Sequence, residues 1–197
     1  METSKPILPS QPLRPAVFLD RDGTLVEDRG VLAEPTEVMF YPDTVNALRR
    51  LQARFLLFIV TNQPWVTRGI ITLEQVNRVN AWVISYLAEH GVAITAVYVC
   101  PHDREEGCDC IKPRPYFLRK AAKDYGVDLE RSFTVGDHPH DVEFAQSVGA
   151  RGVYVRTGHG EKHLHELRPD EIVTSGIAEA ADWILTKADD RECRRSE

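Results

Sequence analysis

The chain has 197 residues, of which 43% are apolar and 27% are charged, and its formal net charge is −6. These values are typical of a globular protein with one sizeable core, and they predict a single domain. A general nucleic-acid binder needs a basic face, so the acidic balance argues against a nucleic-acid partner. No apolar run approaches the roughly 18 residues that span a bilayer, so we expect no membrane partner.

The two ends of the chain differ in composition from the rest. Residues 1–15 are rich in proline and lack the apolar core of a signal peptide, so we expect a cytoplasmic protein with a flexible N-terminal arm. The highly charged residues 189–197 predict a flexible tail. The folded domain is therefore expected to span residues 16–188, and we expect it to be a monomer.

Between these ends, short apolar runs alternate with amphipathic segments. The predicted strands are 16–20, 55–62, 93–100, 132–137, 152–158 and a short one after residue 170. The predicted helices are 43–54, 72–91, 116–126, 141–150 and a last one that ends near 188. Thr72 and Gly91 are typical first and last residues of a helix. This alternation predicts an α/β fold: a single Rossmann-like three-layer domain whose central sheet is mostly parallel.

Polar side chains follow several of the predicted strands. Asp20 and Asp22 lie where the first strand ends, Thr61 and Asn62 close the second, and Asp137 closes the fourth. Ligands of a parallel sheet bind outside the carboxyl ends of its strands. We therefore expect these side chains to share one site.

The chemistry of these residues favours phosphoryl transfer. Two carboxylates one residue apart repel each other unless a cation neutralises them, and Mg²⁺ prefers such oxygen ligands. Asp137 and Asp141 can face the same ion, and Lys112 adds a positive charge. An ion, a lysine and hydrogen-bond donors suit a phosphoryl group. One aspartate would then act as nucleophile and the other as general acid and base.

The ordered motifs "FLDRDGT", "TN", "KP" and "GD…D" resemble those of the haloacid dehalogenase superfamily of phosphotransferases. The resemblance implies the following roles. Asp20 is the nucleophile and a Mg²⁺ ligand; Asp22 is the general acid and base and binds the metal through its backbone carbonyl; Thr61 and Lys112 hold the phosphoryl group; Asp137 is a Mg²⁺ ligand and Asp141 a supporting carboxylate.

A second set of residues indicates another metal. Cys100, His102, Cys108 and Cys110 lie within "CPHDREEGCDC" and form a Cys3His set. Zinc takes four such ligands in a closed structural site, whereas a catalytic zinc needs an open position. We therefore predict a structural Zn²⁺ in loop 100–110, with a cluster of unligated thiols as the alternative. The loop leads directly into Lys112, so zinc is expected to help position that residue.

The zinc loop narrows the resemblance to the branch of histidinol-phosphate and D-glycero-D-manno-heptose 1,7-bisphosphate phosphatases. These proteins lack a mobile cap domain, and the short segment before residue 43 agrees with a capless chain. The resemblance extends to "TNQ" and the following "RG", so Asn62 and Arg68 are predicted substrate contacts. Two departures stand out: Ile111 replaces an arginine and His138 a lysine of the heptose group. Trp65 is equally open to two interpretations, a substrate contact or a core residue.

We predict a Mg²⁺-dependent phosphomonoesterase that acts through an aspartyl-phosphate on a small phosphorylated metabolite. A sugar phosphate such as heptose bisphosphate, or histidinol phosphate, fits the resemblance. One alternative is a phosphatase for a larger phosphorylated partner, since a capless site is open. Another is a catalytically silent scaffold of the same fold, which the intact pair Asp20 and Asp22 argues against. A zinc-dependent docking module and a phosphomutase or nucleic-acid 3′-phosphatase complete the alternatives.

Overall fold

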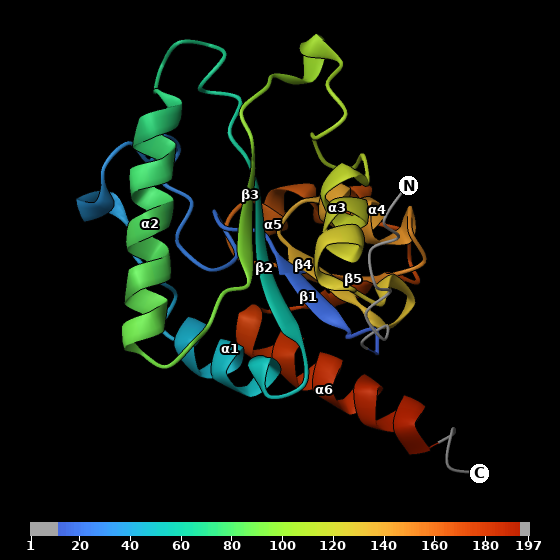
Figure 1. Cartoon of the computed structure of the whole chain (residues 1–197). Coiled ribbons are helices and arrows are strands. Elements are labelled where there is room, and N and C mark those ends of the chain that lie inside the picture. Colours follow the sequence, from blue (N-terminus) through green and yellow to red (C-terminus); the bar gives the residue numbers. More distant parts are fainter. Residues whose placement is uncertain (1–11, 194–197) are drawn as a thin grey trace, which may run out of the picture.

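The computed structural model describes residues 12–193 of the chain, with side chains up to residue 189. Six strands form one sheet in the order β3-β2-β1-β4-β5-β6 (Figure 1), and every neighbouring pair is parallel. The strands are β1 (Ala16–Leu19), β2 (Leu56–Asn62), β3 (Ala96–Cys100), β4 (Phe133–Gly136), β5 (Arg151–Val155) and β6 (Ile172–Thr174). The predicted α/β class is confirmed, and the sheet is parallel throughout.

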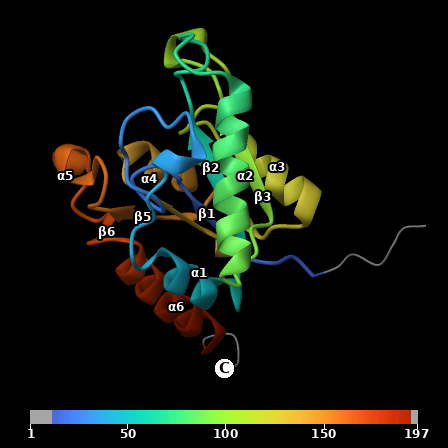
Figure 2. The same ribbon diagram turned by 90° about the vertical axis from the view of Figure 1, so that its left-hand side faces the viewer.

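Six helices connect the strands and cover both faces of the sheet. They are α1 (Thr44–Gln52), α2 (Leu73–Glu89), α3 (Tyr116–Tyr125), α4 (Pro139–Gln146), α5 (Gly160–His163) and α6 (Ile177–Cys193). One face packs against α1, α2 and α6, and the other against α3 and α4 (Figures 1 and 2). Thr72 caps α2 as expected, since its side chain accepts a hydrogen bond from the Gln75 amide.

Two segments differ from the expectation. The histidine-rich stretch 158–166, for which no helix was predicted, contains α5 and a following 3-10 turn at Leu164–Glu166. The last helix continues to Cys193, past the expected domain end at 188. Residues 1–11 and 194–197 of the predicted arm and tail lie outside the described residues.

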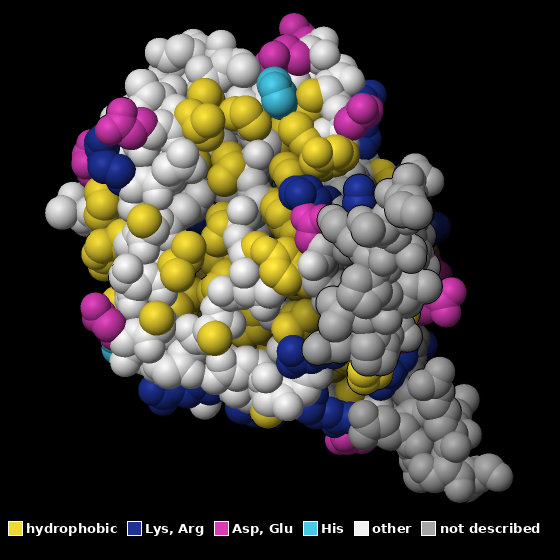
Figure 3. All heavy atoms as spheres, in the orientation of Figure 1, with side chains coloured by type: hydrophobic (Ala, Val, Ile, Leu, Met, Phe, Trp, Pro, Cys, Tyr) yellow, Lys and Arg dark blue, Asp and Glu magenta, His cyan; other side chains and the backbone are white. Residues whose placement is uncertain are grey.

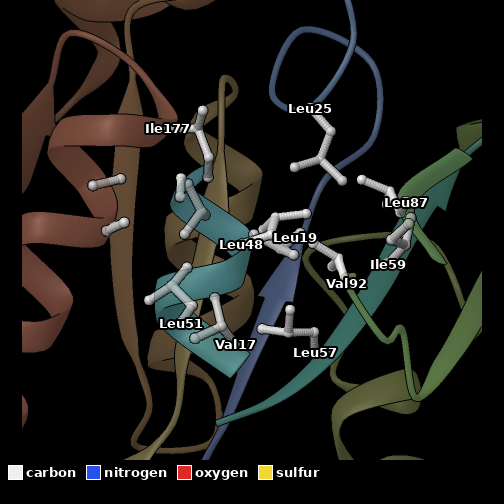
Figure 4. Packing of buried hydrophobic residues seen from close by; sticks show 14 of the residues in the cluster. Val17, Leu19, Leu25, Leu48, Leu51, Leu57, Ile59, Leu87, Val92 and Ile177 are labelled. Atoms are coloured by element: carbon white, nitrogen blue, oxygen red, sulfur yellow. The ribbon is translucent and has the colours of Figure 1, made fainter. Parts of the chain in front are cut away.

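The strands are buried on both faces because alternate residues point to opposite helix layers. Leu57 and Ile59 of β2 join the cluster under α1, α2 and α6 (Figure 4), whereas Phe58 and Val60 pack on the α3 side. This explains why the sequence shows an unbroken apolar run instead of an alternating one. Burial of such a side chain contributes about 1.5–3 kcal/mol, so the two clusters dominate the stability of the fold.

The strand order places the site. Strand β1 has β2 on one side and β4 on the other, so the chain progresses in opposite directions from the centre of the sheet. A crevice forms at such a switch point, outside the carboxyl ends of the strands. Asp20 follows β1 directly, and its amide donates to the carbonyl of Val135 in β4 at 2.9 Å. The first carboxylate of the motif is therefore held at this crevice by backbone geometry.

No cap domain covers the crevice in the described part of the chain. Between β1 and α1 the only helical segment is the 3-10 turn Pro35–Glu37. The helices of the described residues include none that is long and apolar enough to cross a membrane. On the face seen in Figure 3, basic side chains gather along the lower edge, and acidic ones are scattered elsewhere.

Candidate active site

A pocket of about 180 Å³ opens at the carboxyl ends of β1, β2 and β4. It is lined by Asp20, Asp22, Asp28, Gly30, Thr61, Asn62, Gln63, Trp65, Arg104, Lys112, Asp137, His138, His140 and Asp141. Seven of the eight residues predicted for phosphoryl transfer line it: Asp20, Asp22, Thr61, Asn62, Lys112, Asp137 and Asp141. A larger hollow of about 630 Å³ lies along α3 and is lined by none of these carboxylates, so it is not the predicted site.

Lys112 joins two carboxylates at the base of the pocket. Its Nζ donates to Oδ1 of Asp20 at 2.5 Å and to Oδ1 of Asp141 at 2.6 Å, and all three side chains are buried or nearly so. Burial alone would lower the pKa of Lys112, but Asp141 and Asp20 raise it above its usual value. Lys112 is therefore charged at neutral pH, as a phosphate-binding lysine must be.

Asp137 sits in a cradle of two glycines. A Cβ atom at Gly23 or at Gly158 would lie 2.1 or 2.2 Å from its Oδ2, and Gly158 also has a φ of +56°. The amide of His159 donates to the same oxygen at 2.7 Å. Burial, and then repulsion from Asp141, raises the pKa of Asp137 to about 7. The glycine of the "DGT" motif is thus required for space as well as for its turn.

The excess of acidic groups fits a divalent cation. Burial raises the pKa of Asp20 well above its usual value; Lys112 opposes this effect, whereas Asp141, Asp137 and Asp22 add to it. Lys112 pairs with Asp20 and Asp141, and Arg21 pairs with Asp22, so two cations face these four carboxylates. A hard divalent ion would neutralise the remaining charge. The donor set and its electrostatics therefore fit Mg²⁺.

Asp22 is held by two residues that the sequence analysis did not select. Arg21 donates to its Oδ1 through Nε at 3.0 Å and to its Oδ2 through Nη2 at 2.8 Å. Gln63 donates to Oδ2 at 2.8 Å and to Oγ1 of Thr61 at 2.8 Å. The third nitrogen of Arg21, Nη1, donates to Oδ1 of Asn80 in α2 at 2.7 Å. Asn80 is a polar residue on the otherwise apolar buried face of α2. Its position in the sequence could have indicated that it has a buried polar partner.

Arg68, the other expected substrate contact, is not among the residues that line the pocket. Its guanidinium pairs with Asp103 and lies 5.1 Å from the centre of the Trp65 ring. The residue therefore ties the segment after β2 to the zinc loop. Trp65 is half-buried and does line the pocket, which favours the substrate-side interpretation of this residue. Asn62 also lines it and accepts a hydrogen bond from the Lys112 amide at 3.3 Å.

The two departures from the family pattern have clear structural positions. Ile111 is 7% exposed and packs in the apolar cluster under α3, away from the pocket lining. His138 lines the pocket as the first residue before α4, and burial, followed by His140, lowers its pKa to about 4. At neutral pH neither position supplies a positive charge to a ligand.

The predicted zinc ligands converge. The ligand atoms of Cys100, His102, Cys108 and Cys110 all lie within 4.8 Å of one another. The Sγ atom of Cys110 lies 3.1 Å from Sγ of Cys100 and 3.6 Å from Sγ of Cys108. It also lies 3.3 Å from Nδ1 of His102. Three sulfur atoms and one imidazole nitrogen at this spacing suit tetrahedral coordination of one ion. The arrangement confirms the Cys3His cluster.

Comparisons with known proteins agree with this geometry. A family model described as HAD-hydrolase-like matches residues 109–180. The D-glycero-beta-D-manno-heptose-1,7-bisphosphate 7-phosphatase of Yersinia pestis is 36% identical over 186 residues, which cover 89% of this chain and 92% of that protein. The enzyme of the same name from Pseudomonas aeruginosa is 33% identical and is 98% covered.

A solved structure extends the similarity to three dimensions. The crystal structure of D,D-heptose 1,7-bisphosphate phosphatase from B. bronchiseptica, complexed with magnesium and phosphate, superposes with a TM-score of 0.80 at 32% identity. The alignment covers 88% of this chain and 99% of that one. With this identity over nearly the whole length of its relatives, the chain belongs to the D-glycero-D-manno-heptose-1,7-bisphosphate 7-phosphatase family of haloacid-dehalogenase-like phosphatases.

Proposed function

We propose that this chain is a Mg²⁺-dependent phosphomonoesterase that acts on a phosphorylated sugar through an aspartyl-phosphate on Asp20. Its relatives are named for D-glycero-D-manno-heptose 1,7-bisphosphate, which makes this compound the first substrate to test. The observation that carries the proposal is the convergence of Asp20, Asp141 and Lys112 beside Asp137 at the sheet's switch point.

The residues divide the reaction as follows. The carboxylate of Asp20 attacks phosphorus, and the bond between phosphorus and the sugar oxygen breaks. Asp22 gives a proton to that oxygen, and the sugar leaves as an alcohol. Asp22 then takes a proton from water as the water attacks the aspartyl-phosphate, which releases phosphate and restores Asp20. Lys112 and Thr61 hold the phosphoryl oxygens throughout.

The carboxylates of Asp20 and Asp137 and the backbone carbonyl of Asp22 are the proposed ligands of Mg²⁺. When bound, the ion neutralises charge that develops on the phosphoryl oxygens. Cys100, His102, Cys108 and Cys110 are the proposed ligands of a structural Zn²⁺. Because Lys112 follows Cys110 by two residues, an ordered zinc loop keeps the lysine in place.

Phosphate release tests the proposal directly. Wild-type protein and Asp20→Asn are incubated with heptose 1,7-bisphosphate, histidinol phosphate and a panel of sugar monophosphates, with Mg²⁺ or with EDTA. We expect turnover only in wild type with Mg²⁺. Folded, Mg²⁺-loaded wild type that releases no phosphate from any of these esters would support the silent scaffold or the larger-partner alternative.

The second candidate substrate is a sugar monophosphate. Two positions that carry positive charge in the heptose phosphatases hold a buried isoleucine, Ile111, and a neutral histidine, His138, in this chain. Besides Lys112, Arg104 is the one lysine or arginine among the residues that line the pocket. A second phosphate therefore meets less positive charge than the family pattern supplies. A higher kcat/KM for a monophosphate than for the bisphosphate would select this candidate.

A further inference from the structure

The arginine between the two catalytic aspartates is the largest side chain among the fully buried ones of residues 12–189. Arg21 is 0% exposed, whereas the side chain of Asp22 is 19% exposed at the pocket. Replacing a buried ion pair with apolar residues is often neutral or stabilising, so stability alone does not account for an arginine here. The contacts of Arg21 indicate what it does instead.

The guanidinium fork of Arg21 engages both oxygens of one carboxylate. Nε donates to Oδ1 of Asp22 and Nη2 donates to Oδ2, at 3.0 and 2.8 Å. A planar fork that binds a carboxylate in this way fixes its rotation as well as its position. A lysine at the same place would supply a point charge without this control of orientation.

The two oxygens of Asp22 differ in how many donors they meet. Oδ2 accepts from Arg21 and also from Gln63 at 2.8 Å, so its two lone pairs are used. Oδ1 accepts from Arg21 alone among the described side chains and keeps one lone pair. Since Asp22 lines the pocket, this lone pair is the position from which a proton can move.

Arg21 is itself held by a hydrogen bond to helix α2, which packs on one face of the sheet. Its Nη1 donates to Oδ1 of Asn80, which is 5% exposed on α2 between the core residues Val79 and Val83. Helix α2 therefore carries one buried polar group on its sheet-facing side, and that group contacts the arginine. Hydrogen bonds from Asn80 through Arg21 to Asp22 therefore connect helix α2 to the exposed edge of the pocket.

We propose that Arg21, anchored by Asn80, is a positioning residue that holds Asp22 so that Oδ1 is its proton-transfer atom. The inference rests on the proposed function. In the first step the proton on Oδ1 moves to the sugar oxygen as the bond between that oxygen and phosphorus breaks. In the second step Oδ1 receives a proton from the water that attacks the aspartyl-phosphate, and phosphate leaves. Arg21 keeps its own protons throughout, because a guanidinium group is not deprotonated in proteins.

The test compares Arg21→Met, Arg21→Lys and Gln63→Met in the full Mg²⁺-loaded enzyme, each with and without Asp22→Asn. Two substrates are used: an alkyl sugar phosphate, whose leaving oxygen needs a proton, and p-nitrophenyl phosphate, whose leaving group does not. Arg50→Met removes an arginine of a surface ion pair with Asp182 and is the matched control. Circular dichroism confirms that each variant is folded.

For Arg21→Met we expect kcat on the alkyl phosphate to fall by about 10²-fold with KM changed less than about threefold, the cost of a misplaced proton donor. On p-nitrophenyl phosphate kcat/KM falls less than about fivefold, because no proton transfer is needed. Arg21→Lys recovers only part of the loss. In the Asp22→Asn background Arg21→Met changes kcat/KM on p-nitrophenyl phosphate by less than about twofold, since both variants act on one group.

Two results would overturn the inference. Equal losses of kcat/KM on both substrates, or a full additional loss in the Asp22→Asn background, would show that Arg21 acts on the fold or the phosphate. If Arg21→Met does not fold, Gln63→Met provides the test. It must lower the ratio of kcat/KM on the alkyl phosphate to kcat/KM on p-nitrophenyl phosphate. The decrease is expected to be about tenfold at most, because Asp22 loses only one of its three hydrogen bonds. Wild type that is inactive on both substrates would instead refute the proposed function, and with it the inference.

Discussion

Lys112 offers the sharpest test of how the site is held together. Replacing it with methionine keeps most of the unbranched apolar stem and removes the charge that two buried carboxylates share. At an effective dielectric constant of about 20, unit charges 2.6 Å apart attract by roughly 6 kcal/mol. Removing the cost of burying an ammonium group offsets part of that attraction. We expect Lys112→Met to lower the free energy of unfolding by about 3–5 kcal/mol at neutral pH.

The pH dependence of this loss follows from Asp20. Lys112 lowers the pKa of Asp20, so its removal raises a pKa that is already well above the usual value. A carboxyl group with a raised pKa binds more protons in the folded state than in the unfolded state, so the variant loses stability as pH rises through that range. The destabilisation is therefore expected to be larger at pH 8 than at pH 5.

Urea denaturation of the metal-free proteins measures both effects. Lys120→Met is the control: its ion pair with Asp124 is on the surface of α3, and it should change stability by less than about 0.5 kcal/mol. Adding Asp141→Asn to Lys112→Met removes one of the two unpaired carboxylates and should restore part of the loss. The reasoning is wrong if Lys112→Met is as stable as wild type, or if Asp141→Asn destabilises it further.

Three further predictions address the metal sites and the pocket. Gly158→Ala should raise the Mg²⁺ concentration needed for half-maximal activity by at least about tenfold, because the new Cβ atom would displace Asp137. Gly69→Ala is the control and should leave this concentration unchanged. Gly69 has a similar φ of +71°, and no atom lies within 4 Å of the position of a Cβ there. Cys108→Ser should lower the zinc content measured by a metal-chelating dye from one ion per chain and lower the melting temperature; unchanged zinc would contradict the ligand set. NMR should show that His138 stays neutral down to about pH 4, because burial lowers its pKa. The unfolded chain binds this proton at a higher pH, so the folded protein should lose stability as pH falls from about 6.5 to 4. A titration of His138 near pH 6.5 would contradict the burial argument.

Local pattern was sufficient for the architecture. Unbroken apolar runs such as residues 55–60 predict strands covered on both faces, and the alternation with amphipathic helices predicts a parallel sheet. The carboxylates that follow those strands could be assigned to one edge because parallel strands end at the same side. The spacing of Cys100, His102, Cys108 and Cys110 was likewise sufficient to predict that these side chains cluster, since four residues within one short loop need no distant partner.

Only the tertiary structure could select the residues that support the site from elsewhere in the chain. Asn80 lies 59 positions after Arg21, and nothing local to either residue predicts that they are hydrogen-bonded. Arg68 resembled a substrate contact in sequence, yet the fold brings Asp103 to it, and a nearby carboxylate takes the guanidinium. Gly158 is needed because a Cβ atom there would lie 2.2 Å from Oδ2 of Asp137 and 2.4 Å from Cα of Gly23. The types of side chain that follow each strand can be read from a few consecutive residues. The orientation of these side chains and the distances between them depend on packing between residues far apart in the sequence.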